Sequence, residues 1–306
     1  MIKIGTDCSG IEAPIEALKK ICDVYDLSYE HVFSSEIDKY AIQYIKDNHE
    51  PTILFNDMMK RNIEDVPAID LYVSGFPCQP FSRANKFKTN VDPRLNLFNN
   101  CLDIIKHKTP KIFILENVKT LVTLNNGQYF KEILKILNDI DIYDIYWNIV
   151  NSKDYGIPHC RDRLYIIGIQ KSLSKHTFEF PEKKQMINIK EFIDDTDNTI
   201  MDIKENNTNL FKNIPQDSVF IDVGFRKAKF PNSNKWAPCI TAQPNMWCVP
   251  KHRKANIKEY LSLQGFPLNV IQSISDHQFK KKIGNSMTVN VIEELLIQCF
   301  KNINMI

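Results

Sequence analysis

A cysteine framed by two prolines is the residue in this sequence best suited to attack a substrate. Cys78 stands in the run GFPCQPFS at residues 75–82, just after the apolar segment Leu71–Ser74. Because proline fixes its own φ angle, the two prolines stiffen the loop on both sides of the thiol. A buried structural cysteine needs no such framing, whereas a nucleophile held at a defined angle does. The pattern predicts that Cys78 is a catalytic nucleophile.

A carboxylate at the end of an apolar strand is the second candidate. Glu116 directly follows Ile112–Leu115. Burial there favours a carboxyl group that can carry a proton at neutral pH. A thiol and such a carboxyl group at neighbouring strand ends form a pair suited to covalent catalysis.

Three other apolar runs end in residues suited to holding a nucleoside cofactor. Ser9 and Gly10 follow the first run, where small residues let a ligand approach the backbone. Glu36 follows the second and can bind both hydroxyls of a ribose. Asp57 follows the third and can accept a hydrogen bond from an adenine amino group. An ordinary turn, a solvated carboxylate and a helix N-cap are the respective alternatives.

Strands and helices must alternate to position these residues. Apolar runs predict strands at 2–5, 31–34, 71–74, 111–115 and 164–169, and periodicity predicts helices at 13–21, from Asp38, at 96–106 and at 128–137. Such alternation predicts an α/β fold with a doubly wound, mostly parallel sheet. In such sheets ligands bind at the carboxyl ends of the strands, where the candidates stand.

The character of the chain changes near residue 171. Polar residues then dominate, periodicity is lost, and order returns with helices predicted at 258–264 and 289–300. We predict a catalytic and cofactor-binding domain at 1–170 and a smaller, irregular domain at 171–252. A return segment at 253–306 is expected to pack its last helix on the first domain.

Composition narrows the class of protein. The formal net charge of the 306 residues is +2, so a nucleic acid would have to be met by local basic patches. The eight cysteines form no CxxC pair, which argues against a structural zinc site. We find neither a signal peptide nor an apolar run long enough to span a membrane. An intracellular protein with free thiols is expected.

The motifs together resemble those of the DNA (cytosine-5) methyltransferase family. The runs GFPCQPFS at 75–82 and ENV at 116–118 are similar to its two signature motifs. Three further stretches follow in the family's order: DYGIP with RDR at 154–163, LQGFP at 263–267 and KIGNS at 282–286. The resemblance covers 1–170 and about 253–298 and implies a Rossmann-like, class I S-adenosylmethionine-dependent fold. The N-terminal run CSGIEA is most similar to phage-type members.

The sequence departs from the family pattern at several positions around the cofactor motifs. Thr6-Asp7-Cys8 replaces acid-any-Phe, Glu12-Ala13 replaces Gly-Gly, Ile37 replaces an aromatic residue, His159 replaces Gln, and Leu95 replaces Gly. The first three of these changes bear on how tightly the cofactor is held.

The resemblance implies a mechanism on an extruded cytosine. Cys78 would attack C6, Glu116 would meet the N3 edge, Arg163 would hold O2, and Arg161 would support the same pocket. Because a stacked base is out of reach, it must flip out of the duplex. No metal is required.

The resemblance also implies which residues bind the cofactor and the DNA. S-adenosylmethionine would be bound by Ser9, Gly10, Ile11, Glu36, Ile37, Asp57, Met58, Pro77, Leu97 and Asn285. Double-stranded DNA would be contacted by Ser82, Arg83, Lys86, Arg94, Arg226, Lys227 and Arg253, of which Arg226 and Lys227 belong to a target-recognition domain at 171–252 and Arg253 directly follows it. Solvated surface charges are the alternative for the basic residues. A monomer is expected, with a cognate restriction endonuclease as partner, in the cytoplasm or nucleoid, or in the nucleus of a eukaryotic host.

Two rival functions remain open. A tRNA cytosine-5 methyltransferase of the same fold usually carries Cys-Phe-Thr after the Glu-Asn-Val motif, whereas Lys119-Thr120-Leu121 follows here. A catalytically inactive DNA-binding subunit is the other, and the intact Cys78, Glu116 and Arg163 argue against it.

Overall fold

A computed structural model describes residues 1–77, 95–201, 214–224 and 233–306 of the chain. Its main element is a seven-stranded sheet in the order β3-β2-β1-β4-β5-β7-β6. The strands are β1 (Ile2–Asp7), β2 (Tyr29–Ser35), β3 (Ile53–Phe55), β4 (Leu71–Ser74), β5 (Ile112–Val118), β6 (Tyr143–Asn151) and β7 (Asp162–Gln170). The strands from β1 to β5 pair in parallel, and β7 runs antiparallel to both of its neighbours. This arrangement confirms the predicted doubly wound, mostly parallel sheet.

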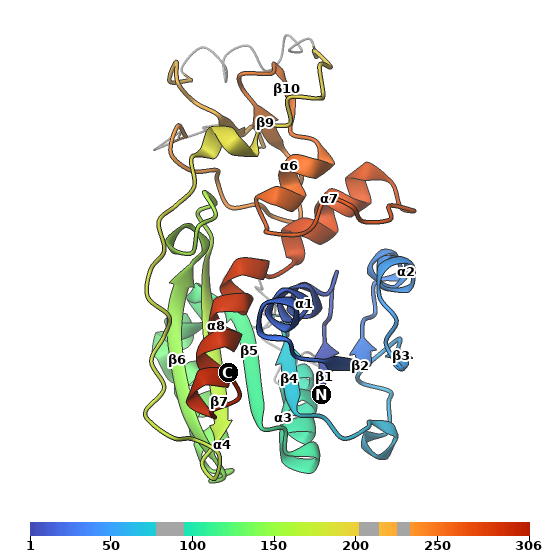
Figure 1. Ribbon diagram of the computed structural model, residues 1–306, viewed down its shortest axis with the longest axis vertical. Helices are drawn as coiled ribbons and strands as arrows, with labels where there is room; N and C mark the ends of the chain where they lie inside the picture. Colours follow the sequence, from blue (N-terminus) through green and yellow to red (C-terminus); the bar gives the residue numbers. More distant parts are fainter. Residues whose placement is uncertain (78–94, 202–213, 225–232) are drawn as a thin grey trace.

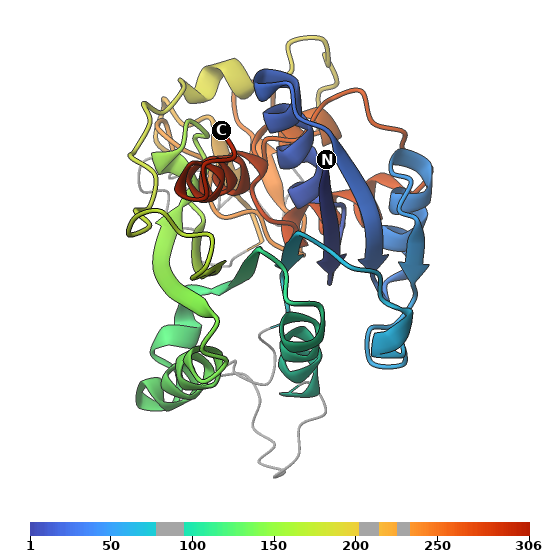
Figure 2. The same ribbon diagram turned by 60° about the horizontal axis from the view of Figure 1, so that its bottom comes forward.

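Helices cover both faces of the sheet. The first face carries α1 (Ala13–Tyr25), α2 (Lys39–Asn48) and α8 (Val289–Asn302), and the second carries α3 (Leu95–Lys108) and α4 (Gln128–Asn138). Figures 1 and 2 show the sheet between these two layers, with α8 beside α1. The strands therefore bury apolar side chains on both sides, which explains their continuous apolar runs.

A small antiparallel sheet, β10-β9-β8, lies beyond one end of the large sheet (Figure 1). Its strands are β8 (Phe220–Asp222), β9 (Met246–Cys248) and β10 (Arg253–Lys254), and the helices α6 (Ile257–Ser262) and α7 (Asp276–Asn285) follow them in the chain. The strands are two or three residues long, too short to show a periodic pattern. Because β10 begins at Arg253, the small sheet extends just past the predicted boundary at 252.

The structure confirms the predicted strands and helices of the first 170 residues, with ends that shift by a few residues. Asp38 caps α2 as predicted, since its carboxylate accepts from the backbone N–H groups of Tyr40 and Ala41. The strand β6 was missed. It lies at the edge of the sheet, where Trp147, Asn148 and Ile149 are exposed, so its sequence has neither a continuous apolar run nor strict alternation.

Candidate active site

The carboxylate and one of the paired arginines meet at the end of β5. Glu116 Oε1 lies 3.1 Å from Nε of Arg163 on the neighbouring strand β7, and the Glu116 side chain is 12% exposed. Arg163 also donates from Nη1 to the carbonyl of Asp162, 2.8 Å away. The two predicted base-binding residues are thus brought together by the β5–β7 pairing, with the guanidinium as counter-charge to the carboxylate.

The loop that leads to the predicted nucleophile packs against this pair. A Cβ built on Gly75 would lie 2.8 Å from Cε of Met287 and 3.6 Å from Glu116 Oε2, so a side chain here would crowd the site. Asn117 Nδ2 donates to the carbonyl of Phe76 over 3.0 Å, inside the protein. The Asn of the Glu-Asn-Val motif therefore fixes the loop to β5. Cys78 itself lies outside the described residues.

Arg161 does not share the pocket of Arg163. Its guanidinium is buried and donates to three backbone carbonyls, those of Ile240 (2.9 Å), Gly284 (3.2 Å) and Ser286 (2.5 Å). These carbonyls come from the segment that follows residue 237, from the last turn of α7 and from the connection between α7 and α8. In this structure Nη1 and Nη2 of Arg161 join the predicted recognition part, which comprises the small sheet and α6 with the segments that flank them after residue 171, to the large sheet.

His159 strengthens the same joint. Burial lowers the pKa of His159 well below its ordinary value, so the neutral ring accepts a hydrogen bond at Nε2 from the backbone N–H of Ile240, 2.9 Å away. A backbone bridge pairs His159 with Ala237. A Cβ on Gly284 would lie 2.0 Å from the carbonyl oxygen of Thr241, so this contact requires glycine. Sequence reasoning noted the unusual histidine but did not predict its structural role.

A pocket opens at the carboxyl ends of the first four strands. Its volume is about 280 Å³, and its lining is largely apolar. The lining consists of Cys8, Ser35, Glu36, Ile37, Asp57, Met58, Met59, Pro77 and Leu97. Six of the ten predicted cofactor residues are among them, and Cys8, Ser35 and Met59 were missed although each is within two residues of a predicted one. Because Pro77 lines the pocket, the pocket adjoins the loop that reaches Cys78.

Two carboxylates are held in defined positions at this pocket. Glu36 accepts from the backbone N–H groups of Gly10 (2.7 Å), Ile37 (2.9 Å) and Asp38 (2.9 Å). Asp57 accepts at Oδ1 from the N–H of Met59 over 2.9 Å. The side chain of Ile37 is 74% exposed and forms part of the pocket rim. The arrangement suits a nucleoside whose ribose hydroxyls and amino group bind carboxylate oxygens.

The other predicted cofactor residues lie outside the lining. Gly10 has a φ of +57°, the left-handed region that glycine adopts easily, and its N–H faces Glu36. Ser9 is buried and its hydroxyl bonds Thr6 of β1 and the backbone of Ser35 at the end of β2, and Ile11 is buried in the core. Asn285, at the end of α7, is exposed. Ser9 and Gly10 thus support residues that line the pocket, whereas Ile11 belongs to the core and Asn285 lies outside the lining.

An unforeseen arginine fixes the Asp57 loop to β1. Arg61 forms a two-pronged ion pair with Asp7, in which Nη2 lies 2.6 Å from Oδ2, and it also donates to Ser35 Oγ over 2.6 Å. Its guanidinium lies over the rings of Phe33 and Phe55. The displaced acid of the first motif, Asp7, thus anchors the loop that carries the pocket residues Asp57 to Met59.

Most of the predicted DNA contacts lie outside the described residues: Ser82, Arg83, Lys86, Arg94, Arg226 and Lys227. Arg253 is described, and the structure gives it another role. It is 1% exposed and donates from Nη1 and Nη2 to the two carboxylate oxygens of Glu259, each over 2.9 Å. A guanidinium engaged in this way is unavailable to a phosphate, so we do not propose Arg253 as a DNA contact.

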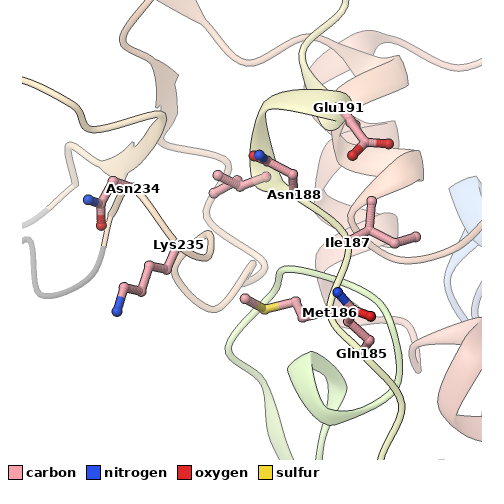
Figure 3. Close-up of a pocket in the computed structure, with 8 residues that line it drawn as sticks. Gln185, Met186, Ile187, Asn188, Glu191, Asn234 and Lys235 are labelled. Atoms are coloured by element: carbon pink, nitrogen blue, oxygen red, sulfur yellow. The ribbon is translucent and has the colours of Figure 1, made fainter.

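A larger hollow lies in the recognition part and contains none of the predicted site residues. Its volume is about 630 Å³, and it is open to solvent between the segment 185–191 and Asn234 with Lys235 (Figure 3). Within the described part of the chain, no cluster of three or more His, Cys, Asp or Glu could hold a metal ion. Of the helices described, none is long and apolar enough to cross a membrane.

The sheet order, the reversed β7 and a nucleoside-sized pocket at the strand ends define a class I, Rossmann-like methyltransferase. The family model of the C-5 cytosine-specific DNA methylases matches residues 6–301. The chain therefore belongs to this family and is a DNA (cytosine-5) methyltransferase. Its family and fold imply S-adenosylmethionine as the methyl donor.

Relatives agree with this assignment, and solved structures agree with the fold. The chain is 36% identical to the Type II methyltransferase M1.ScrFI of Lactococcus lactis subsp. cremoris, over 86% of this chain and 70% of that protein. It is 35% identical to M.HaeII of Haemophilus aegyptius, over 90% and 87%. The fold resembles the Entamoeba histolytica methyltransferase EhMeth (TM-score 0.75, 19% identity, 98% of both chains) and S. pombe Dnmt2 (0.73, 17%, 99% and 100%). Activity on tRNA and a catalytically inactive subunit are not favoured.

Proposed function

We propose that the chain methylates C5 of an extruded cytosine in double-stranded DNA by covalent catalysis at Cys78. The observation that carries this proposal is the position of the loop at residues 75–77. Its first residue packs against Glu116, and its last, Pro77, lines the nucleoside-sized pocket. Cys78 follows Pro77 directly in the sequence, which supports its assignment as the nucleophile that acts between the base-binding pair and the cofactor pocket.

The pocket residues fit S-adenosylmethionine. Glu36 would accept from the ribose hydroxyls, Asp57 would accept from the adenine amino group, and Met58, Pro77 and Leu97 would cover the adenine ring. The bound cofactor supplies an electrophilic methyl group.

The Glu116–Arg163 pair suits the cytosine ring. Arg163 can donate to O2 while the Glu116 carboxyl group meets N3, which stabilises a ring that gains electron density. The Cys78 thiolate forms a bond to C6, and the electron pair released to C5 takes up the methyl group. Loss of the C5 proton restores the C5–C6 double bond, and its electrons expel the thiolate. The free enzyme keeps Glu116 and Arg163 paired, so the base would insert into an arrangement that is already assembled.

The relatives suggest the biological setting. Those named above are Type II methyltransferases, which supports a modification enzyme that acts within a short DNA sequence alongside a cognate restriction endonuclease. We also propose that residues 171–252 form the target-recognition domain, with Arg226 and Lys227 on DNA, and that the enzyme acts as a monomer. Ser82, Arg83, Lys86 and Arg94 would contact the phosphates around the extruded base.

Trapping on 5-fluorocytosine tests the proposal. Fluorine at C5 cannot leave as a proton does, so the thiolate cannot be expelled and the enzyme stays bound. With S-adenosylmethionine and a 5-fluorocytosine DNA duplex, the wild-type protein is expected to form a denaturation-resistant complex that migrates more slowly in a gel. Cys78→Ala is expected to form none.

Cys22→Ala is the matched control, because Cys22 is a buried thiol of α1 and is expected to leave trapping unchanged. An adduct in Cys78→Ala would overturn the nucleophile assignment. Equal trapping on a fluorinated RNA of the same sequence would overturn the assignment of DNA as the substrate.

A further inference from the structure

Glu12 is a buried carboxylate at a position where glycine is typical of the family. Its side chain is 0% exposed, and its backbone adopts the left-handed conformation with a φ of +60° and a ψ of +44°, just before α1. A non-glycine residue in that conformation is strained. A buried carboxylate is also costly unless it is hydrogen-bonded. A glutamate therefore occupies this position despite a strained backbone conformation and the cost of burying its carboxylate.

The carboxylate of Glu12 joins the ends of two parallel strands. Thr6 of β1 donates from Oγ1 to both carboxylate oxygens, over 2.9 and 3.1 Å, and Ser34 of β2 donates from Oγ to Oε1 over 2.6 Å. The two donors stand one residue before the end of their strands. A single side chain thus links β1 and β2, which are already paired here, at the edge where the pocket opens.

The same hydrogen-bond network continues into the cofactor loops. Thr6 Oγ1 lies 2.7 Å from Ser9 Oγ, which in turn receives the backbone N–H of Ser35 over 3.2 Å. Ser35 lines the pocket and precedes Glu36, whose carboxylate is held by the N–H of Gly10. Glu12 therefore lies beneath the loop contacts that place Glu36, although it does not line the pocket itself.

The charged and titratable groups around Glu12 come from three elements. His31 of β2 lies 3.8 Å from Oε1, while Glu36 after β2 and Tyr44 of α2 lie further away. Burial lowers the pKa of His31 to about 4, so His31 gives Glu12 no positive partner at neutral pH. Burial raises the pKa of Glu12 to about 7, against the hydrogen bonds from Ser34 and Thr6 that lower it.

We propose that Glu12 is a positioning residue for the cofactor pocket, which holds the Ser9–Gly10 and Ser35–Glu36 loops at the spacing that S-adenosylmethionine requires. The ionised carboxylate accepts at both oxygens from Thr6 and Ser34, whereas in the protonated form one oxygen becomes a donor and the hydroxyl that donated to it has to reorient. The positive sulfonium of the cofactor further favours the ionised form. The inference rests on the proposed cofactor role of this pocket.

The test measures the dissociation constant of S-adenosylmethionine by calorimetry on the full chain, without DNA. Glu12→Gln keeps the size of the side chain but places an amide against two hydroxyl donors. It is expected to weaken binding about tenfold at neutral pH. Wild-type binding is expected to weaken as the pH falls from about 8 to about 6, and the variant is expected to lose this dependence. At saturating cofactor, kcat is expected to stay within about twofold of wild type.

Three comparison variants make the outcomes decisive. Glu259→Gln alters an equally buried carboxylate in the recognition part and is expected to bind the cofactor as wild type does. Glu12→Gly suits the left-handed backbone, so it provides a folded test if the amide variant does not fold, and it is expected to weaken binding at least as much. Affinity in both Glu12 variants equal to that of Glu259→Gln would overturn the inference. Unchanged affinity in Glu36→Ala would instead overturn the cofactor role of the pocket.

Discussion

Glu12 and Glu259 are both fully buried carboxylates, one beneath the cofactor pocket and one at the base of the recognition part. Glu259 faces a guanidinium, since Arg253 donates to both of its oxygens. Glu12 faces only hydroxyl donors and a histidine whose burial keeps it neutral. Burial raises the pKa of Glu12 to about 7, so this carboxylate, which depends on hydroxyl donors, can take up a proton. The recognition part thus uses a glutamate in an ion pair, whereas the glutamate beneath the cofactor pocket forms hydrogen bonds that protonation can change.

Removing the cation from the recognition part should have the largest effect. Arg253→Ala leaves the Glu259 carboxylate buried without its partner, which typically costs about 3–5 kcal/mol. We expect the free energy of unfolding in urea to fall by that amount, with faster proteolysis in the segment 171–252. The double variant Arg253→Met with Glu259→Leu should recover part of the loss, because it leaves no unpaired charge. A loss below about 1 kcal/mol in Arg253→Ala would contradict the anchor role.

Changing the pH should alter the contribution of Glu12 to the free energy of unfolding. Burial raises the pKa of Glu12 from 4.5 to about 7, so between these values the folded state binds a proton that the unfolded state releases. Stability therefore falls as the pH rises through this window, by roughly 3 kcal/mol. Glu12→Gln should remove this component, which is read as the difference between wild-type and variant unfolding free energies across the window.

The pKa shifts of two histidines change the stability with pH in the opposite direction. Their effect must be separated from that of Glu12. Burial lowers the pKa of His31 to about 4 and that of His49 to about 3. The unfolded state then binds more protons below pH 6.5, so their contribution to stability rises with pH. His31 lies 3.8 Å from Glu12, so wild type and Glu12→Gln are both compared in a His31→Gln background, where the effect of His49 cancels in the difference. A difference that stays constant from about pH 4.5 to 7 would refute the protonation of Glu12.

Weakening the joint between the two regions should have the smallest effect on stability. Arg161→Gln loses most of the hydrogen bonds to the carbonyls of Ile240, Gly284 and Ser286. We expect a loss of about 2 kcal/mol and a weaker preference for the target sequence, measured on cognate and scrambled duplexes. Trapping by Cys78 on a cognate duplex at saturating protein should persist, because Arg161 is not part of the base pocket. Complete loss of trapping in a folded variant would restore Arg161 to that pocket.

The sheet and six of the residues that line the pocket at its edge could be predicted from the sequence, because their signals are local. Apolar runs mark the buried strands, and the residue after each run marks the strand end, as for Glu36, Asp57 and Glu116. The roles of Arg61 and Arg161 could not be predicted, since each depends on partners brought close by the fold. Arg61 meets Asp7 across 54 residues, and Arg161 meets Ile240 across 79. Arg253 shows the converse error, because a basic residue near aromatics can equally be an internal anchor.

The tight contact at Gly284 has a consequence for how such an enzyme can change its target. The carbonyl of Thr241 approaches so closely that even a methyl group at residue 284 would collide with it, which leaves the two halves of the molecule little freedom to rotate against each other. Sequence changes outside this contact can alter what the outer loops touch without disturbing the docking angle. A natural or engineered exchange of recognition segments between relatives would therefore succeed where the new segment preserves the close contact between Gly284 and the carbonyl of Thr241.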